Sequence, residues 1–245
     1  GLMARALRES DRADADGDGH ATRIGIAQNL RIFDPYSSNP VDALVAGAAD
    51  GFYDESFLDA ITLGRVRVVL PKVIDIDEPF PPLAGSLDFL GINYYFRQVV
   101  AGDGGHGFVV TPLPGVERTQ MGWEVYPDGL RDLLLEFKRR YPALPPIYIT
   151  ENGLASADVV AEGRVHDAQR ARYFNSHLAA VDQAMRQGVD VRGYFAWSLM
   201  DNFEWGYGYE KRFGLVHVDY ATQARTPKDS ALAFRQFLQG RKAGR

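Results

Sequence analysis

Residues 145–153, with the sequence PPIYITENG, decide how the rest of the chain is read. The apolar run from Ile147 to Thr150 has the β-branched and aromatic side chains of a buried strand, and prolines and a glycine bound it. The run ends at a carboxylate, Glu151. Parallel α/β sheets place their chemistry at the carboxyl ends of strands, so Glu151 is a candidate catalytic group. A solvated glutamate that opens a loop explains this stretch alone equally well.

Three other stretches have the same strand character, and helical patterns separate them. These predicted strands are residues 22–30, 87–95 and 191–198. Regular alternation of strand and helix predicts a parallel sheet with helices packed outside it. The length of 245 residues matches a complete eight-stranded barrel, which typically has about 250 residues. Only four strands are found, however, so the pattern predicts half a barrel.

Helix signals follow each predicted strand. Asn39 is expected to cap a helix that has Pro40 at its first position, and Asp128 and Asp167 to cap two amphipathic helices. The pair Thr226-Pro227 is expected to open the last helix. The segments between them are interpreted as a helix tail (2–9), a polar loop (10–20), a short apolar run (65–69), a proline-rich loop (75–82), a glycine-rich turn (101–107), a small excursion beside it (108–111), and an aromatic loop with a hairpin (201–220).

Composition excludes several classes of function. The net charge of −5 gives no basic surface for nucleic acid. No apolar run reaches the roughly 18 residues that a membrane-spanning helix needs. Cysteines are absent, and the five histidines have no ligand spacing, so we expect no metal and no cofactor.

The polar loop contains one motif that imitates a calcium-binding loop. Asp14, Asp16 and Asp18 alternate as the first ligands of such a loop do. The twelfth position, which requires a bidentate glutamate, is Gly25. A flexible linker is therefore the favoured interpretation, with calcium binding as the alternative.

The three tryptophans fall in the loops that follow strands. Trp123 precedes a helix, Trp197 ends the last strand, and Trp205 lies in the loop after it. This placement favours a platform for flat apolar faces such as those of sugar rings, whose hydroxyls need hydrogen-bond partners. Carboxylates such as Glu204 stand among these aromatics, and one carboxylate accepts two hydroxyls. Tryptophans scattered through a core are the alternative.

Several motifs resemble those of one enzyme family. Residues 149–153 (ITENG) resemble the nucleophile motif of glycoside hydrolase family 1, the β-glucosidase family. Residues 89–95 (FLGINYY) resemble its sixth-strand motif, and residues 194–205 (YFAWSLMDNFEW) resemble its eighth-strand signature. Residues 213–220 (FGLVHVDY) and 225–230 (RTPKDS) continue the resemblance, which covers nearly the whole chain from Thr22 onward.

The resemblance implies a fold and an activity. The fold is α/β, a (β/α)8 barrel of the TIM-barrel family, of which this chain holds only strands five to eight and their helices. Residues 1–21 are then a helix tail plus the Asp/Gly-rich loop, and residues 22–245 are the C-terminal half of the barrel. The activity is hydrolysis of β-glycosidic bonds with retention, through a covalent glycosyl-enzyme. Such an enzyme needs two carboxyl groups about 5–5.5 Å apart.

The resemblance also assigns roles to residues. Glu151 is the nucleophile, Tyr95 hydrogen-bonds it and stabilises its charge, and Asn93 lies beside the site. The remaining assignments concern the sugar: Glu204 accepts two hydroxyls, Trp205 hydrogen-bonds nearby, Trp197 forms the stacking floor, Trp123 flanks the leaving group, and Phe213 closes the pocket. Phosphoglycoside-specific relatives bind phosphate around the position of Glu204. A glutamate there repels a phosphate, so an unphosphorylated sugar is favoured.

The family's second carboxylate is missing from this sequence. The family supplies it from an Asn-Glu-Pro motif on the fourth strand, and the nearest string here, Asp77-Glu78-Pro79, lies in a loop before the sixth-strand motif. Glu78 is therefore interpreted as an ordinary loop residue. We expect activity on a β-glucoside or related oligosaccharide only when an N-terminal barrel half, or a second copy, completes the site. The alternative is a non-catalytic half barrel that binds sugar or serves in assembly. No membrane or nucleic-acid partner is expected, and the expected location is the cytoplasm.

Overall fold

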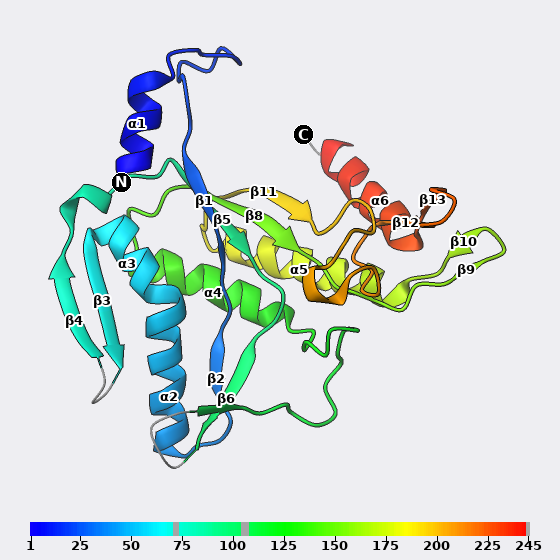
Figure 1. Ribbon diagram of the computed structural model, residues 1–245, viewed down its shortest axis with the longest axis horizontal. Coiled ribbons are helices and arrows are strands. Elements are labelled where there is room, and N and C mark those ends of the chain that lie inside the picture. Colours follow the sequence, from blue (N-terminus) through cyan, green and yellow to red (C-terminus); the bar gives the residue numbers. More distant parts are fainter. Residues whose placement is uncertain (71–73, 104–107, 244–245) are drawn as a thin grey trace.

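Four parallel strands form the central sheet of the protein (Figure 1). The computed structural model describes residues 1–70, 74–103 and 108–243. The strands of the sheet, in order, are β1 (Gly25–Asn29), β5 (Phe89–Asn93), β8 (Ile147–Asn152) and β11 (Val191–Ala196). Neighbouring strands follow one another along the chain, and helices lie in the connections between them. The four predicted strands and their parallel arrangement are confirmed.

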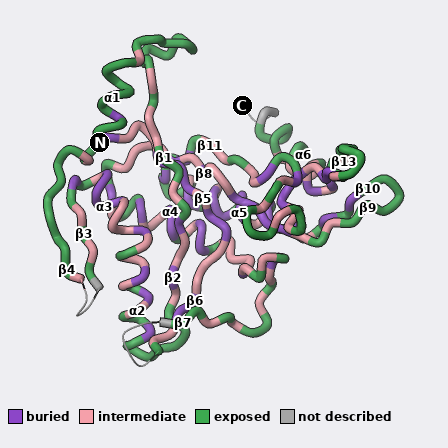
Figure 2. Tube along the Cα trace, viewed as in Figure 1, coloured by how far each residue is buried: buried purple, intermediate pink, exposed green. Residues whose placement is uncertain are grey.

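Two long helices cover one face of this sheet. They are α4 (Pro127–Arg140) and α5 (Ala168–Arg186) (Figure 1). Leu90 and Ile92 of β5 and Ile149 of β8 are fully buried in the main core, together with Leu130 and Leu134 of α4. Figure 2 shows buried residues concentrated where β5 and β8 meet these helices. The sheet thus has one face buried against helices, as half of a helix-wrapped barrel requires.

A long insertion between β1 and β5 builds a second layer at one side of the sheet (Figure 1). The Asn39 side chain accepts a hydrogen bond from the Val41 amide at 3.0 Å, and Pro40 is the first helical residue, as predicted. The insertion contains β2 (Phe33–Pro35), α2 (Pro40–Asp50), the π-helix η1 (Gly51–Glu55), α3 (Ser56–Leu63), β3 (Arg65–Leu70), β4 (Ile74–Pro79) and the 3-10 helix η2 (Pro81–Leu83).

The prediction of a loop over residues 75–82 is wrong for most of its length. β4 pairs antiparallel with β3 in an unbroken register from Arg65 opposite Pro79 to Leu70 opposite Ile74. The prolines that suggested a loop lie at the end of β4 or beyond it, where a missing N–H breaks few ladder bonds. The acidic residues of β4 are exposed, so this is a solvated hairpin outside the central sheet.

Short strands and the terminal helices complete the fold. β2 pairs with β6, and β6 with β7, in a small three-stranded sheet. The predicted glycine-rich turn begins within β6, and its residues 104–107 lie outside the described residues; the excursion after it is β7. The remaining elements are α1 (Leu2–Ser10), β6 (Gln98–Gly102), β7 (Phe108–Val110), β9 (Val160–Ala161), β10 (Arg164–Val165), the 3-10 helix η3 (Trp205–Tyr207), β12 (Val216–Val218), β13 (Arg225–Pro227) and α6 (Asp229–Ala243).

Three helix or hairpin boundaries differ from the prediction. α4 begins at Pro127 with Tyr126 as its N-cap, so Asp128 lies inside the first turn and accepts a hydrogen bond from Arg131 at 2.7 Å. The pair Thr226-Pro227 belongs to β13, and α6 begins only at Asp229. The hairpin expected within residues 201–220 is formed by β12 and β13 and so extends to Pro227. For the two helices, a proline or acidic residue gave the signal one to three residues from the true boundary.

Apolar side chains on the two edge strands, β1 and β11, are exposed to solvent. Phe195 of β11 is 56% exposed and Ile26 of β1 is 38% exposed. A closed barrel has no such edges, because each strand pairs on both sides. The four-stranded sheet therefore has the open edges expected of half a barrel. Among the described residues, no helix is long and apolar enough to span a membrane.

Candidate active site

Glu151 lies at the carboxyl end of β8, where neighbouring strand ends converge. It is opposite Asn93 of β5, and the next residue, Asn152, is opposite Ala196 of β11. The Tyr95 hydroxyl donates a hydrogen bond to Glu151 Oε2 at 2.5 Å. Parallel strands bring these residues together because their carboxyl ends share one edge of the sheet.

Tyr95 is suited to remain a hydrogen-bond donor. Burial, and then the hydrogen bond to Glu151, raise the pKa of the Tyr95 hydroxyl well above its usual value. The hydroxyl therefore keeps its proton throughout the physiological range. A donor of this kind stabilises the ionised form of the carboxylate that accepts from it.

Asn152, beside Glu151, ties the strand ends together. Its buried amide nitrogen donates to the Tyr94 carbonyl at 2.6 Å and to the Tyr173 hydroxyl at 2.9 Å. Its side-chain oxygen accepts from the Tyr194 hydroxyl at 2.5 Å. One amide, in the residue that follows the candidate nucleophile, thus connects the segment after β5 with α5 and β11. The sequence analysis quoted Asn152 in a motif but assigned it no role.

Gly153 lets the loop after β11 approach the end of β8. A Cβ atom at this position would lie 1.9 Å from the Trp197 carbonyl oxygen. No side chain fits there, so the glycine is required by close backbone packing. The Trp197 amide donates to the Asn152 carbonyl at 2.9 Å, and this bond holds Trp197 beside the Glu151 strand end.

Aromatic rings form a wall next to Tyr95. The centroid of the Trp123 ring lies 5.3 Å from that of Tyr95 and 6.1 Å from that of Phe213. Phe213 is buried, whereas Trp123 and Trp197 are half-buried at the border of the same cluster. The structure thus brings together four of the predicted aromatic or hydroxyl-bearing site residues.

Glu204 lies within electrostatic range of this group. Burial raises the pKa of the Glu204 carboxyl, hydrogen bonding from Asn202 and Trp197 lowers it, and the charge of Glu151 raises it. Trp205 is different: it is 83% exposed, and its side chain lies open to solvent. Asn93 accepts a hydrogen bond from the Thr150 hydroxyl at 2.6 Å, so it too lies beside the end of β8.

A buried ionic network supports the loop that carries Glu204. Lys228 is fully buried, and its ammonium lies 2.5 Å from Asp158 Oδ2 and 2.7 Å from Asp201 Oδ1. Arg170, also fully buried, pairs with Asp158 at 2.8 Å. Burial acts to raise the pKa of Asp158, but the positive charges of Arg170 and Lys228 outweigh it and hold that pKa below its usual value. Local sequence patterns do not reveal this network, because its members lie as far as 70 positions apart.

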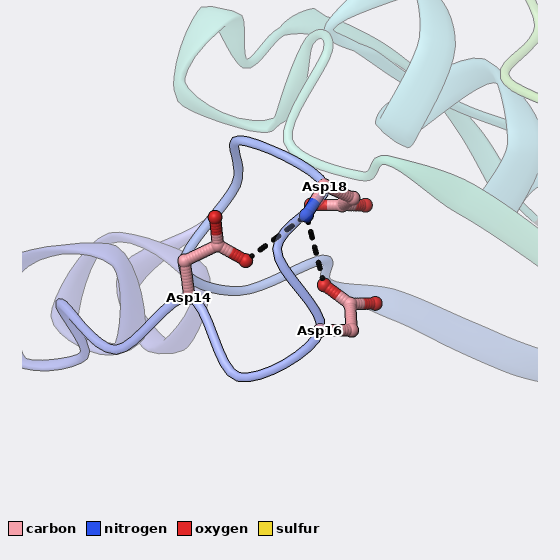
Figure 3. Close-up of side chains that lie close together, drawn as sticks. All are labelled: Asp14, Asp16 and Asp18. Carbon is pink, nitrogen blue, oxygen red and sulfur yellow. Dashed lines mark hydrogen bonds between the residues drawn. The ribbon is translucent and has the colours of Figure 1, made fainter.

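Two weaker predictions are also placed by the structure. Glu78 lies opposite Val66 in the β3–β4 hairpin, which is outside the central sheet and away from the carboxyl end of β8 (Figure 1). Asp14, Asp16 and Asp18 do lie together, with two of their carboxylates accepting hydrogen bonds from the Asp18 amide (Figure 3). All three side chains are exposed, and hydrogen bonds within the loop account for their positions.

Comparison with known proteins agrees with this geometry. Residues 3–243 match the family model of glycosyl hydrolase family 1. Beta-glucosidase A of Thermotoga maritima is 39% identical over 93% of this chain, and 6-phospho-beta-galactosidase of Staphylococcus aureus is 35% identical over 90%. The crystal structure of the beta-glucosidase from Exiguobacterium antarcticum B7 superposes on 91% of this chain with a TM-score of 0.82 and 35% identity.

The same comparisons fix how much of the family fold is present. The chain covers 52% of beta-glucosidase A, 55% of the 6-phospho-beta-galactosidase and 52% of the superposed structure. It therefore spans about half the length of the curated relatives it matches. The expectation of a partial (β/α)8 barrel is confirmed, since the four-stranded parallel sheet lies within these barrels. The family model matches residues 3–243, and the strand ends bring together a glutamate, a tyrosine and an aromatic wall. The chain therefore belongs to glycosyl hydrolase family 1.

Proposed function

We propose that the chain supplies the nucleophile half of a retaining β-glycosidase site. The observation that carries this proposal is the hydrogen bond from Tyr95 to Glu151 Oε2, 2.5 Å long, at the carboxyl end of a barrel strand. Glu151 is partly exposed, so a substrate atom can reach it. In the proposed first step, a Glu151 oxygen bonds to the anomeric carbon as the glycosidic oxygen leaves, giving a covalent glycosyl-enzyme. Water then displaces the sugar from Glu151.

Other residues around Glu151 take binding roles in this proposal. Glu204 accepts two hydroxyls of the sugar, and Trp205 donates nearby. Trp197 provides the stacking floor, Trp123 flanks the leaving group, and Phe213 closes the pocket. Asn93 stands beside the site. Support comes from the cluster that Tyr95, Phe213, Trp123 and Trp197 form, and from the proximity of Glu204 to Glu151.

The substrate class in this proposal is an unphosphorylated β-glucoside or a related oligosaccharide. An ionised carboxylate at position 204 repels a sugar phosphate. A relative named 6-phospho-beta-galactosidase is also similar to the chain, at 35% identity compared with 39% for beta-glucosidase A. Substrate choice therefore rests on the charge at Glu204. The cytoplasmic location stays a prediction.

The general acid of the reaction comes from outside this chain in our proposal. The sequence has no Asn-Glu-Pro motif, and Glu78 lies in a hairpin outside the sheet. An N-terminal barrel half is the proposed partner, because it would cover the open edges of β1 and β11 as well as supply the acid. A second copy of this chain would cover the edges without supplying that motif.

Leaving-group dependence tests the missing acid. Without an acid, attack by Glu151 succeeds only when the departing group is already stable as an anion. We expect slow release of dinitrophenol from dinitrophenyl β-glucoside by this chain and no hydrolysis of cellobiose. Addition of an N-terminal half is expected to restore cellobiose hydrolysis. Appreciable cellobiose hydrolysis by this chain alone would contradict the missing acid, and inertness toward both substrates with the half present would favour a non-catalytic role.

A further inference from the structure

A cavity of about 220 Å³ lies between η1 and α4, in the helical layer outside the central sheet. The carboxylates at its wall include Asp50, Asp54 and Glu55 at the junction of α2 and η1, and Asp132 and Glu136 on α4. None of the residues that line the cavity is among those proposed for glycoside hydrolysis. A π-helical turn such as η1 is rare and occurs frequently at functional sites.

Asp54 has a buried oxygen with no partner. The residue is 2% exposed, and its Oδ1 atom makes no hydrogen bond. Its other oxygen accepts from the Arg31 amide at 3.3 Å. A buried carboxylate oxygen without a hydrogen-bond partner costs free energy. At the wall of a cavity, such an oxygen is a vacant acceptor for a donor group of a ligand.

The basic side chains around the cavity have other partners, although the buried Nε atom of Arg31 has none. Arg140 pairs with Glu55, and the Arg31 guanidinium donates to the Tyr53 hydroxyl at 2.6 Å. Arg131 pairs with Asp132, and Arg139 with Glu136. Among the described residues, Asp50 and Asp54 form no ion pair with a basic side chain. The cavity therefore holds two carboxyl groups without an ion-pair partner, although the charge of Arg31 acts on Asp54 from farther away.

We propose that this cavity binds a small organic cation, with a primary ammonium group between Asp50 and Asp54 and its alkyl stem against Leu133 and Phe137. An ammonium group has three donors and so can satisfy Asp54 Oδ1 and Asp50 together. Apolar side chains also line the cavity, so a ligand with an apolar stem fits it better than a purely polar ligand does.

A metal ion suits this cavity less well than an ammonium group. Within the described parts of the chain, the only acidic trio close enough together to ligate one ion is Asp14, Asp16 and Asp18. Direct coordination requires carboxylate oxygens about 2.0–2.6 Å from the ion. An ammonium on a flexible stem reaches two carboxylates over longer hydrogen-bond distances.

The protonation of the pair gives the binding a pH dependence. Burial, and then the charge of Glu55, raise the pKa of Asp50 to about 7; burial, and then the charge of Asp50, raise the pKa of Asp54 to about 8. A cation requires both groups to be ionised, so affinity is expected to fall as the pH drops from 8.5 to 6. The other charged groups that face the pair are Arg31, Asp34, Glu55, Asp132, Glu136 and Arg140.

Titration calorimetry with n-butylammonium chloride at pH 8.5 tests the proposal. We expect saturable binding of one cation by the chain. Binding is expected to weaken about 10- to 100-fold in Asp54→Asn, since a hydrogen bond to a charged group is lost. Asp182→Asn is the matched control: Asp182 is an exposed aspartate paired with Arg186 on α5, and its loss is expected to leave the affinity unchanged. n-Butanol, which has the stem without the charge, is expected not to bind.

Several results would overturn the proposal. The first is equal affinity of the Asp54→Asn and unsubstituted chains for n-butylammonium, and the second is equally strong binding of n-butanol. The third is the absence of saturable n-butylammonium binding at pH 8.5 in a chain that shows a cooperative melting transition. Preferential binding of Mg²⁺ or Ca²⁺ that Asp54→Asn abolishes would replace the ammonium with a metal and would also overturn it. The same titration with an N-terminal half present is expected to give the same affinity. Glycosidase activity plays no part in this readout, so the two proposals fail independently.

Discussion

At the scale of single residues, the contact between Tyr95 and Glu151 joins two barrel strands at the point where chemistry is expected. The motif around Glu151 predicted both the residue and its place at a strand end. The hydroxyl of Tyr95 was assigned to it from the family resemblance, and the structure brings the two within 2.5 Å. The role of Asn152 could not be predicted in this way, because its three side-chain hydrogen bonds depend on tyrosines far apart in the sequence.

Removal of the Tyr95 hydroxyl tests whether this contact matters for reaction. Tyr95→Phe keeps the buried ring but leaves Glu151 without its donor. A hydrogen bond to a charged group contributes about 1.5–3 kcal/mol, so we expect labelling of Glu151 by an activated fluoroglucoside to slow about 10- to 100-fold. Tyr94→Phe is the control, since its hydroxyl donates to the Tyr126 carbonyl rather than to Glu151. Equal slowing in both variants would point to a general loss of packing.

Asp54 gives a prediction for stability against pH. Its pKa in the folded protein is about 8, well above the usual value of 3.8, so the folded state binds the proton more tightly than the unfolded state. Stability is therefore lost as the pH rises from about 4 through 8. We expect Asp54→Asn to raise the free energy of unfolding by about 1–3 kcal/mol at pH 9 and by much less at pH 5. Urea denaturation at both pH values measures this, and a difference independent of pH would contradict it.

At the scale of elements, strands with strong patterns and the helix α2 were predicted well, whereas strand β4 in the insertion between β1 and β5 was not. Ile147–Asn152 has flanking prolines, alternating apolar residues and a terminal glycine, so several local signals agree. β4 has only Ile74 and Ile76 among acidic residues and prolines, and its strand character depends on pairing with β3. Pairing between strands is a tertiary property, which local propensity does not determine.

The close approach of two elements at Gly153 is directly testable. Gly153→Ala places a methyl group 1.9 Å from the Trp197 carbonyl oxygen, so the end of β8 and the loop after β11 must separate. We expect a loss of about 2–4 kcal/mol in unfolding free energy, together with loss of Glu151 labelling. Gly206→Ala is the matched control, because nothing lies within 4 Å of its added Cβ. A near-neutral effect at position 153 would contradict the packing described here.

The buried ionic network predicts unequal effects of two cation deletions. Lys228→Ala leaves the buried carboxylates Asp158 and Asp201 without a shared cation, and we expect a loss of about 3–5 kcal/mol. Arg186→Ala removes an exposed pair with Asp182 and is expected to change stability by about 0–1 kcal/mol. Chemical denaturation compares the two. A similar loss of unfolding free energy in the two variants would show that the network contributes little to holding the loops after β8 and β11.

At the scale of the whole molecule, four parallel strands with helices on one face leave β1 and β11 unpaired at the edges. The count of four strands in the sequence predicted this half, although the length alone matched a complete barrel. Coverage of about half of each relative agrees with that count. How the open edges of β1 and β11 are covered cannot be predicted from the strand pattern, because strand pairing at an edge is a tertiary property.

Association of the chain with an N-terminal half tests the proposed partner. Exposed apolar residues such as Phe195 and open strand edges favour self-association of the chain alone. Size-exclusion chromatography is expected to show aggregates or dimers of this chain, and a 1:1 complex when an N-terminal half of a family relative is co-expressed. A monomer that melts in one cooperative transition without a partner would contradict this expectation.

Mass spectrometry after treatment with dinitrophenyl 2-deoxy-2-fluoro-β-glucoside tests the nucleophile most directly. The fluorine slows hydrolysis of the glycosyl-enzyme, and the dinitrophenyl group removes the need for an acid. With an N-terminal half present, we expect one fluoroglucosyl group per chain, on the peptide that contains Glu151, and none in Glu151→Gln. A label on a different residue, or labelling that persists in Glu151→Gln, would contradict the assignment of Glu151 as the nucleophile.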